Sequence, residues 1–281
     1  MPRSSSTSAA RSHRIRCSPP RAGADAAGDV RSWAMNRLPD KARRALEKAR
    51  SEPLSYVVRV VRSRDGRLVA ILGEAHMKLE KASEIGKEVV GSFELRGVET
   101  FQRKQVALGR LLGVIIQAPR TVLRVLSFGA VKGSTITDAK QLPSGYTVEL
   151  ERAKRMPLGL HVASIYMTGY FVVSTLAVVA PLLAGITPVL AAAIMFVAVL
   201  FQLHLVMLVP AFLFRRHTWS WVLHPFLGIL TPRDHLMAAG TVGMLADHRS
   251  IEAAVVVMGR AHVPGYERLL VEQHGFTRVE L

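Results

Sequence analysis

Apolar and polar positions alternate in the first third of the chain in a way that predicts short strands. The runs SYVVRVV (55–61) and LVAIL (68–72) are rich in β-branched residues, and Asp65-Gly66 between them is typical of a hairpin turn. A helical pattern follows over Lys78–Lys87, and VVGSFELRG (89–97) predicts a further strand. A strand, a helix and a strand in this order indicate a βαβ unit and therefore a parallel sheet.

The end of the chain repeats this order of elements. Between the two units, residues 99–128 predict one or two helices that are interrupted at Pro119. The later pattern predicts, in order, a helix over 231–247, a buried strand over 253–262, a helix over Pro264–His274 and a closing strand over 276–281. We therefore expect an α/β fold with a parallel-type sheet and flanking helices.

A long uncharged stretch separates the two units. The 59 residues from Met156 to Phe214 contain no Asp, Glu, Lys or Arg, and they divide at a turn around Gly185 into two spans of about 160–183 and 189–213. Because about 20 apolar residues cross a bilayer, this pattern predicts a two-helix transmembrane hairpin that interrupts the α/β fold. The chain is therefore not expected to be a purely soluble protein.

Basic residues lie at both outer ends of this stretch, and the turn carries none. The positive-inside rule then places both flanks, and with them both termini, in the cytoplasm. The segments on either side of the hairpin can fold together, so we expect residues 35–155 and 215–281 to be two parts of one domain, with 156–214 as the hairpin. An integral membrane protein of the bacterial inner membrane is the expected localisation.

The net charge of +16 is consistent with a membrane protein, because the basic residues lie mostly in the N-terminal segment and at the ends of the uncharged stretch. Residues 1–50 hold 12 Lys and Arg against 4 Asp and Glu, and residues 1–34, rich in Ser, Arg, Ala and Pro, predict a disordered basic tail. Charge at the tail and at the span ends favours a lipid bilayer as partner, and no nucleic-acid-binding motif is present. Cys17 is the single cysteine, which excludes an intrachain disulfide framework and a Cys-rich metal site.

Two Gly-x-x-His turns carry the candidate chemistry. Each follows a predicted strand and precedes a predicted helix, so that His76 and His262 fall at strand carboxyl ends, where α/β sheets build their sites. With Glu74 and Glu94 nearby, these histidines could ligate a divalent metal or form a metal-free acid–base pair. The alternative is that both histidines are structural turn residues.

The motifs GEAH, ELR, RDHLMA, VVVMGRAHVPGYERLL and GFTRVEL occur in this order. Together they resemble the TraB/PrgY/GumN family, to which the Tiki metalloproteases are related, over about residues 67–105 and 229–281. The resemblance implies a fold shared with erythromycin esterase-like and ChaN-like proteins and a divalent-metal hydrolase. It implies that His76 and His262 are metal or catalytic residues, that Glu94 is an acid–base residue or ligand, and that Arg233 is an orienting cation.

The expected function is a membrane-anchored, metal-dependent hydrolase, peptidase-like, that acts on a peptide or similar small substrate with Mn, Co or Zn. In that mechanism the metal lowers the pKa of a bound water, Glu94 takes its proton, and Arg233 holds the developing oxyanion or a substrate carboxylate. The alternative is a non-catalytic membrane protein that sequesters a peptide or partner, as in pheromone shutdown.

Two polar side chains, Gln202 and His204, lie near the middle of the second predicted span. Polar groups at that depth are costly and often functional, which leaves open a transporter or channel built as a homo-oligomer of the hairpin. An interhelical hydrogen bond is the simpler interpretation, because the antiparallel partner of His204 is Thr168, with Tyr166 and Tyr170 close by.

Overall fold

The computed structural model describes residues 37–75, 78–128, 131–132, 134–142, 145–185, 187–214 and 219–280. The predicted tail over residues 1–34 and the candidate ligand His76 lie outside these ranges. The helices are α2 (Asp40–Arg50), α3 (Glu80–Gly91), α4 (Gly109–Leu126), α5 (Thr135–Gln141), α6 (Leu158–Ala184), α7 (Pro188–Val206), α8 (Leu208–Leu213), α9 (Leu227–Asp247) and α10 (Val263–His274). The strands are β1 (Tyr56–Arg62), β2 (Leu68–Glu74), β3 (Lys78–Leu79), β4 (Leu95–Val98), β5 (Val131–Lys132), β6 (Tyr146–Glu149), β7 (Ala253–Gly259) and β8 (Thr277–Val279).

Among the described residues, six strands form one mixed sheet in the order β6-β4-β7-β2-β1-β8. The neighbours β6, β4, β7 and β2 run parallel, as the βαβ pattern predicts. The other two strands differ, because β1 pairs antiparallel with β2 and β8 pairs antiparallel with β1. The turn at Asp65-Gly66 is the reason for the first exception: Gly66 adopts a positive φ of 88°, which a tight hairpin needs.

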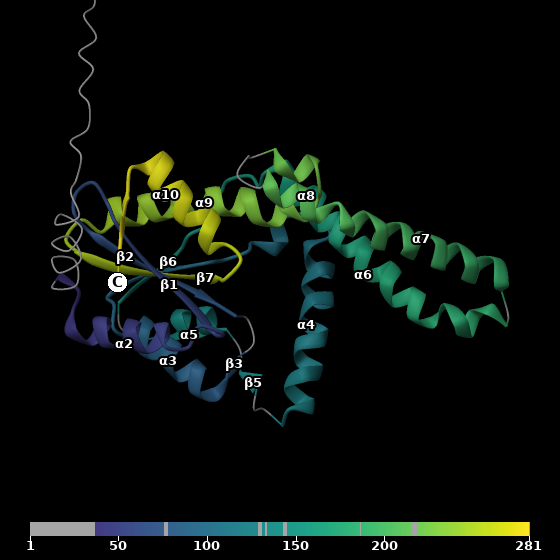
Figure 1. The fold of residues 1–281 in the computed structure, drawn as a ribbon, viewed down its shortest axis with the longest axis horizontal. Helices are drawn as coiled ribbons and strands as arrows, with labels where there is room; N and C mark the ends of the chain where they lie inside the picture. The colour runs from purple at the N-terminus through teal and green to yellow at the C-terminus, as the bar shows by residue number, and fades with distance from the viewer. Residues whose placement is uncertain are drawn as a thin grey trace, which may run out of the picture.

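Helices cover both faces of this sheet (Figure 1). On one face α2, α3 and α5 bury residues such as Leu46 and Val90 against Leu72 and Val257. On the other face α9 and α10 pack on the alternate positions of the same strands. Strands β2 and β7 are therefore buried on both sides, which explains their nearly unbroken apolar sequences.

The sheet joins the two segments that the uncharged stretch separates. Strand β7, which comes after that stretch, lies between β2 and β4, which come before it. The first turns of α6 also pack closely on α9, since a Cβ atom on Gly228 would lie 2.2 Å from the backbone oxygen of Gly159. Strands from the segments on either side of the uncharged stretch thus share one sheet.

Within the described residues, two helices are long and apolar enough to cross a membrane: Leu158–Leu182 and Pro188–Leu213. They form an antiparallel pair that extends away from the α/β body (Figure 1). The interhelical hydrogen bonds expected from the sequence are confirmed. His204 Nδ1 lies 2.6 Å from the hydroxyl of Tyr166, and Gln202 donates to the hydroxyl of Tyr170 over 3.3 Å.

Candidate functional site

The candidate site lies at the carboxyl ends of β4 and β7. These neighbouring parallel strands continue in opposite directions, β4 toward β6 at one side of the sheet and β7 through α10 toward β8 at the other. In open α/β sheets such a reversal leaves a crevice beyond the strand ends, where ligands bind. Glu99 follows β4 directly, and His262 follows β7 at the start of α10.

Buried polar side chains gather at this edge. The described members of the cluster are Glu99, Glu151, Arg233, Asp234 and His262, each with less than a tenth of its side chain exposed. They come from the ends of β4, β6 and β7 and from α9, so the cluster forms only when the two parts of the domain pack together. Burying this many ionisable groups is costly unless they pair with one another.

His262 is held between two carboxylates. Its Nδ1 atom lies 2.6 Å from Oδ1 of Asp234, and its Nε2 atom lies 3.7 Å from Oε1 of Glu99. The first distance is that of a strong charge-assisted hydrogen bond, whereas the second is too long for a direct one. Asp234 therefore fixes the orientation of the ring and favours the proton on Nδ1, which leaves Nε2 to exchange a proton on the side of Glu99.

Arg233 pairs with both glutamates of the cluster. Its Nε atom donates to Glu151 over 2.5 Å, its terminal nitrogen donates to Glu99, and its guanidinium lies 4.9 Å from the ring centre of Phe101. Burial alone would lower the pKa of Arg233, but the two carboxylates outweigh it and raise the pKa above its ordinary value. The side chain is thus permanently charged and already paired, which does not suit the expected role of Arg233 as a free oxyanion-holding cation.

Glu99 connects the cluster to an open cavity. One carboxylate oxygen accepts from the backbone N–H of Gly259, so this side chain ties the end of β4 to the end of β7. Glu99 also lines a cavity of about 810 Å³ whose wall is formed by residues 99–105 together with Lys140 and Glu149. Of the clustered groups, Glu99 is the one that this wall includes.

The structure separates Glu74 from His262. Glu74 is buried, but its carboxylate accepts from the hydroxyl of Ser134 and, over 2.9 Å, from the backbone N–H of Thr135. It therefore holds the start of α5, on the sheet face that Leu72 also occupies, because side chains two residues apart point the same way. The cluster around His262 lies against α9, on the opposite face.

Glu94 is exposed and precedes β4, so it lies at the opposite edge of the sheet from His262. The expectation that these two residues share a site is not met. The residue that occupies the expected place is Glu99, five positions later. The described structure thus brings together Arg233 and His262 of the residues singled out in the sequence, and it adds Glu99, Glu151 and Asp234.

The clustered residues do not by themselves fit a metal ion. Across the ranges that the structure describes, no three His, Cys, Asp or Glu side chains are placed to hold one. Nδ1 of His262 is taken by Asp234, and the Glu99 oxygen that faces Nε2 is capped by the cationic Arg233. A divalent ion needs deprotonated donors free of such a cation, so no catalytic step is assigned to a metal here.

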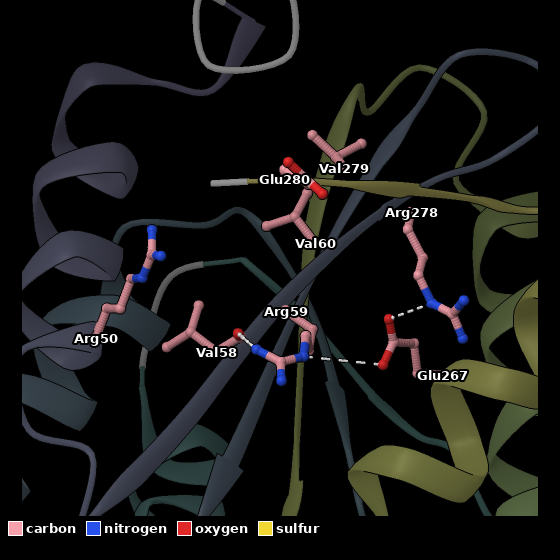
Figure 2. Close-up of a pocket in the computed structure, with 8 residues that line it drawn as sticks. All are labelled: Arg50, Val58, Arg59, Val60, Glu267, Arg278, Val279 and Glu280. Atoms are coloured by element: carbon pink, nitrogen blue, oxygen red, sulfur yellow. Dashed lines mark hydrogen bonds and ion pairs between the residues drawn. The ribbon is translucent and has the colours of Figure 1, made fainter. Parts of the chain in front are cut away.

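A second cavity lies at the other side of the sheet, along β1 and β8 (Figure 2). Its volume is about 580 Å³, and its charged lining residues are Arg50, Arg59, Arg278, Glu267 and Glu280. As Figure 2 shows, Glu267 lies between two arginines, 2.9 Å from Nε of Arg278 and 3.9 Å from Nε of Arg59. This cavity has no described imidazole in its lining, and it offers no comparable acid–base pair.

Comparisons with protein-family models, with curated proteins and with solved structures found no match to this chain.

Proposed function

We propose that the chain is a membrane-anchored hydrolase whose acid–base site is the pair formed by Glu99 and His262. The observation that carries the proposal is that His262 lies between Asp234 and Glu99, and that Glu99 lines an open cavity. An imidazole oriented by a buried carboxylate is the usual form of a general base in hydrolysis, and this one lies at the sheet edge where α/β proteins act on ligands.

The chemistry follows from this arrangement. Glu99 and His262 together accept a proton from water as its oxygen attacks the carbonyl carbon of the substrate, and they return that proton to the leaving nitrogen or oxygen when the bond breaks. Asp234 keeps His262 in the correct tautomer and stabilises its cationic form. Arg233 positions Glu99 through the same oxygen, Oε1, that faces His262, and it has no contact with the substrate in this scheme.

The cavity walls fit a small anionic or peptide-like substrate. Phe101 offers an apolar surface, and Arg103 and Lys104 add positive charge beside Glu99. Lys140 is already engaged by Glu149 over 3.1 Å, so Arg103 and Lys104 are the cations left to meet a substrate carboxylate. A peptide with a free carboxyl terminus has these properties.

The membrane anchor of this proposal is the pair of helices α6 and α7. Their side chains are mostly exposed although they are apolar: 17% of the first span and 6% of the second are buried in the protein. A bilayer would cover this surface. Because β7 lies between β2 and β4, both ends of the hairpin emerge on the side of the α/β domain, which supports placing both flanks on one side of the membrane. The basic residues at the outer ends of the uncharged stretch favour the cytoplasmic side, and the proposed location is a bacterial inner membrane.

The same cluster also favours a second candidate, a protein that binds a peptide without cleaving it. The ion pairs of Arg233 with Glu99 and Glu151 are short and buried, as in a purely structural network. In this case the cavity along residues 99–105 binds the peptide, and His262 serves only to join α10 to α9.

The test uses the full chain in lipid nanodiscs with a library of internally quenched peptides. We expect hydrolysis that survives treatment with EDTA and falls at least a hundredfold in His262→Gln and Glu99→Gln, in keeping with the loss of general acid–base catalysis. Glu267→Gln, at the other cavity, should retain full activity. Thermal melts of each variant exclude unfolding as the cause.

Three other outcomes would overturn the proposal. Binding of a peptide without cleavage, unchanged in His262→Gln, supports the sequestering protein. Loss of activity with EDTA and its return with Mn, Co or Zn supports a metal site completed by residues outside the described ranges. Absence of both binding and cleavage removes both candidate functions.

A further inference from the structure

Helix α4 exposes an apolar surface that no described part of the protein covers. The helix runs unbroken from Gly109 through Pro119 to Leu126, although the sequence predicts an interruption at the proline. Its exposed apolar side chains are Leu111, Val114, Val122, Val125 and Leu126, and Phe128 just beyond the helix is 99% exposed. In water such a surface costs free energy and promotes aggregation, so a partner is expected to cover it.

The apolar side chains follow the helical repeat. At 100° per residue, Leu111, Val114, Val122 and Val125 fall on one side of the helix, while Arg110, Gln117 and Arg124 fall along one flank of that side, about 80–120° from its centre. Leu112, which lies on the other flank, is buried against the protein. Helix α4 is thus amphipathic, with its apolar side outward and arginines beside it, which is the pattern of a helix that lies in a membrane surface.

The position of α4 brings it to the level where the hairpin leaves the α/β body. Just before the helix, the backbone N–H of Ala107 donates to Nδ1 of His161 in the first turns of α6 over 3.1 Å. Val106 packs with Met156 and Leu160 at the same place. From this point α4 runs across the direction of α6 and α7 (Figure 1). A helix that crosses a membrane-spanning pair at its base lies along the plane of the bilayer surface.

Charge identifies the kind of surface. Between Glu99 and Asp138 the chain has six Lys or Arg and no acidic residue. Anionic headgroups attract such a segment, and each basic residue near the surface contributes measurably. A second protein chain would be expected to need complementary carboxylates, whereas phospholipid headgroups supply negative charge and an apolar layer together.

We propose that α4 lies in the cytoplasmic surface of the bilayer, with its apolar side among the acyl chains and its arginines on anionic headgroups. The inference rests on the part of the proposed function that places α6 and α7 across the membrane. It adds a second, lipid-dependent contact next to the cavity, because residues 101–105 of the cavity wall lead directly into the segment before α4.

The test measures membrane depth at single labelled cysteines in the full chain, with Cys17→Ser as background. An environment-sensitive fluorophore is attached at Val114→Cys or Val125→Cys on the apolar side of α4. Leu203→Cys in α7 reports on the hairpin, and Leu54→Cys, 87% exposed on the α/β body, is the control in water. Each variant is placed in nanodiscs of phosphatidylcholine, alone or mixed with phosphatidylglycerol, that contain lipids with a quencher on the acyl chain.

We expect quenching at the two α4 positions and at Leu203, but not at Leu54. Quenching at α4 should be stronger with phosphatidylglycerol. Arg110→Gln and Arg124→Gln should each lower the ratio of membrane-bound to free helix about fivefold in anionic discs. The same substitutions should leave the signal at Leu203 unchanged.

Failure of this inference is distinguishable from failure of the anchor. If Leu203 is quenched and α4 is not, α4 lies off the membrane and the inference is wrong. If α4 is shielded only in discs that hold two chains, a second copy covers it, which also overturns the inference. If Leu203 is not quenched either, the membrane placement in the proposed function is wrong.

Discussion

The imidazole of His262 and the carboxylate of Asp234 are joined by a hydrogen bond of 2.6 Å between Nδ1 and Oδ1. This bond links the turn after β7 to the middle of the domain's long helix α9, and both side chains are buried. It therefore has a structural effect as well as a chemical one, and the two can be measured separately.

A double-mutant cycle measures the energy of this pair. We expect Asp234→Asn and His262→Gln each to lower the free energy of unfolding by about 1–3 kcal/mol, because each replaces the charge-assisted hydrogen bond of this buried pair with, at best, a weaker one. The double variant should lose clearly less free energy of unfolding than the sum of the losses in the two single variants. Denaturation of the solubilised chain checks this, and effects that add within about 0.5 kcal/mol would show that the two residues do not interact.

Arg233 gives a sharper prediction about charge. Arg233→Met leaves Glu99 and Glu151 buried without their cation, so we expect a loss of about 3–5 kcal/mol. Adding Glu99→Gln and Glu151→Gln removes the unpaired buried charges and should recover part of the lost free energy of unfolding. The matched control is Arg278→Met, whose side chain is 61% exposed beside Glu267 and should cost less than about 1 kcal/mol.

Thermal melts of the three variants beside the wild type test this prediction. Equal destabilisation by Arg233→Met and Arg278→Met would mean that the buried network contributes no more than a surface ion pair. A triple variant no more stable than Arg233→Met would mean that the damage comes from lost packing of the arginine stem.

Only some of the residues that pair around Arg233 and His262 can be predicted from the sequence. Both residues stand out in the motifs, and Asp234 is the direct neighbour of Arg233. Their contact with Glu99, however, depends on where β4 ends. Val89 and Val90 were assigned to this strand, but the structure places them on the buried side of α3, so the strand begins at Leu95 and its carboxyl end falls at Glu99. A short apolar run does not distinguish a strand from a buried helical turn.

The order of the strands in the sheet also cannot be predicted from the hydrophobic pattern of each segment. Hydrophobic periodicity predicts β1, β2, β4, β7 and β8 but does not settle β6, and Asp65-Gly66 predicts the hairpin of β1 and β2. The insertion of β7 between β2 and β4 depends on long-range packing, in which α9 and α10 cover one face of the sheet and α3 and α5 cover the other. The cluster around His262 forms only because β7 inserts beside β4. Local sequence pattern does not contain this order, so it groups Glu74 and Glu94 with His262, whereas the fold places both glutamates elsewhere.

His235 makes the stability of the domain depend on pH. Burial lowers the pKa of His235 below its ordinary value of 6.5, and the nearby His274 and Arg268 lower it further. In the described chain its Nε2 atom is buried without a hydrogen-bond partner. Below about pH 6.5 the unfolded chain binds a proton at His235, whereas the folded chain does not. The free energy of unfolding is therefore highest above that pH, and it falls as the pH drops toward the lower pKa that His235 has in the folded state.

The substitution His235→Leu removes this titration and places an apolar side chain beside Pro157 and Trp221, which line the same small cavity. We expect the melting temperature of the wild type to fall more steeply than that of His235→Leu between pH 7 and pH 5. Parallel curves for the two proteins over this range would show that His235 does not contribute.

The last prediction separates the geometry of the site from the chemistry of its residues. A Cβ atom on Gly265 in α10 would lie 2.0 Å from Oδ2 of Asp234, closer than any real contact, whereas a Cβ atom on Gly243 in α9 would meet nothing within 4 Å. Both glycines are in helices, where Ala is favoured over Gly by about 1 kcal/mol. Gly243→Ala should therefore raise the melting temperature, and Gly265→Ala should lower it while turning Asp234 away from His262.

If Asp234 orients the imidazole for proton transfer, Gly265→Ala should also lose hydrolytic activity at temperatures where it is fully folded, although every charged residue of the cluster is retained. Full activity in folded Gly265→Ala would show that the bond between Asp234 and His262 serves packing alone.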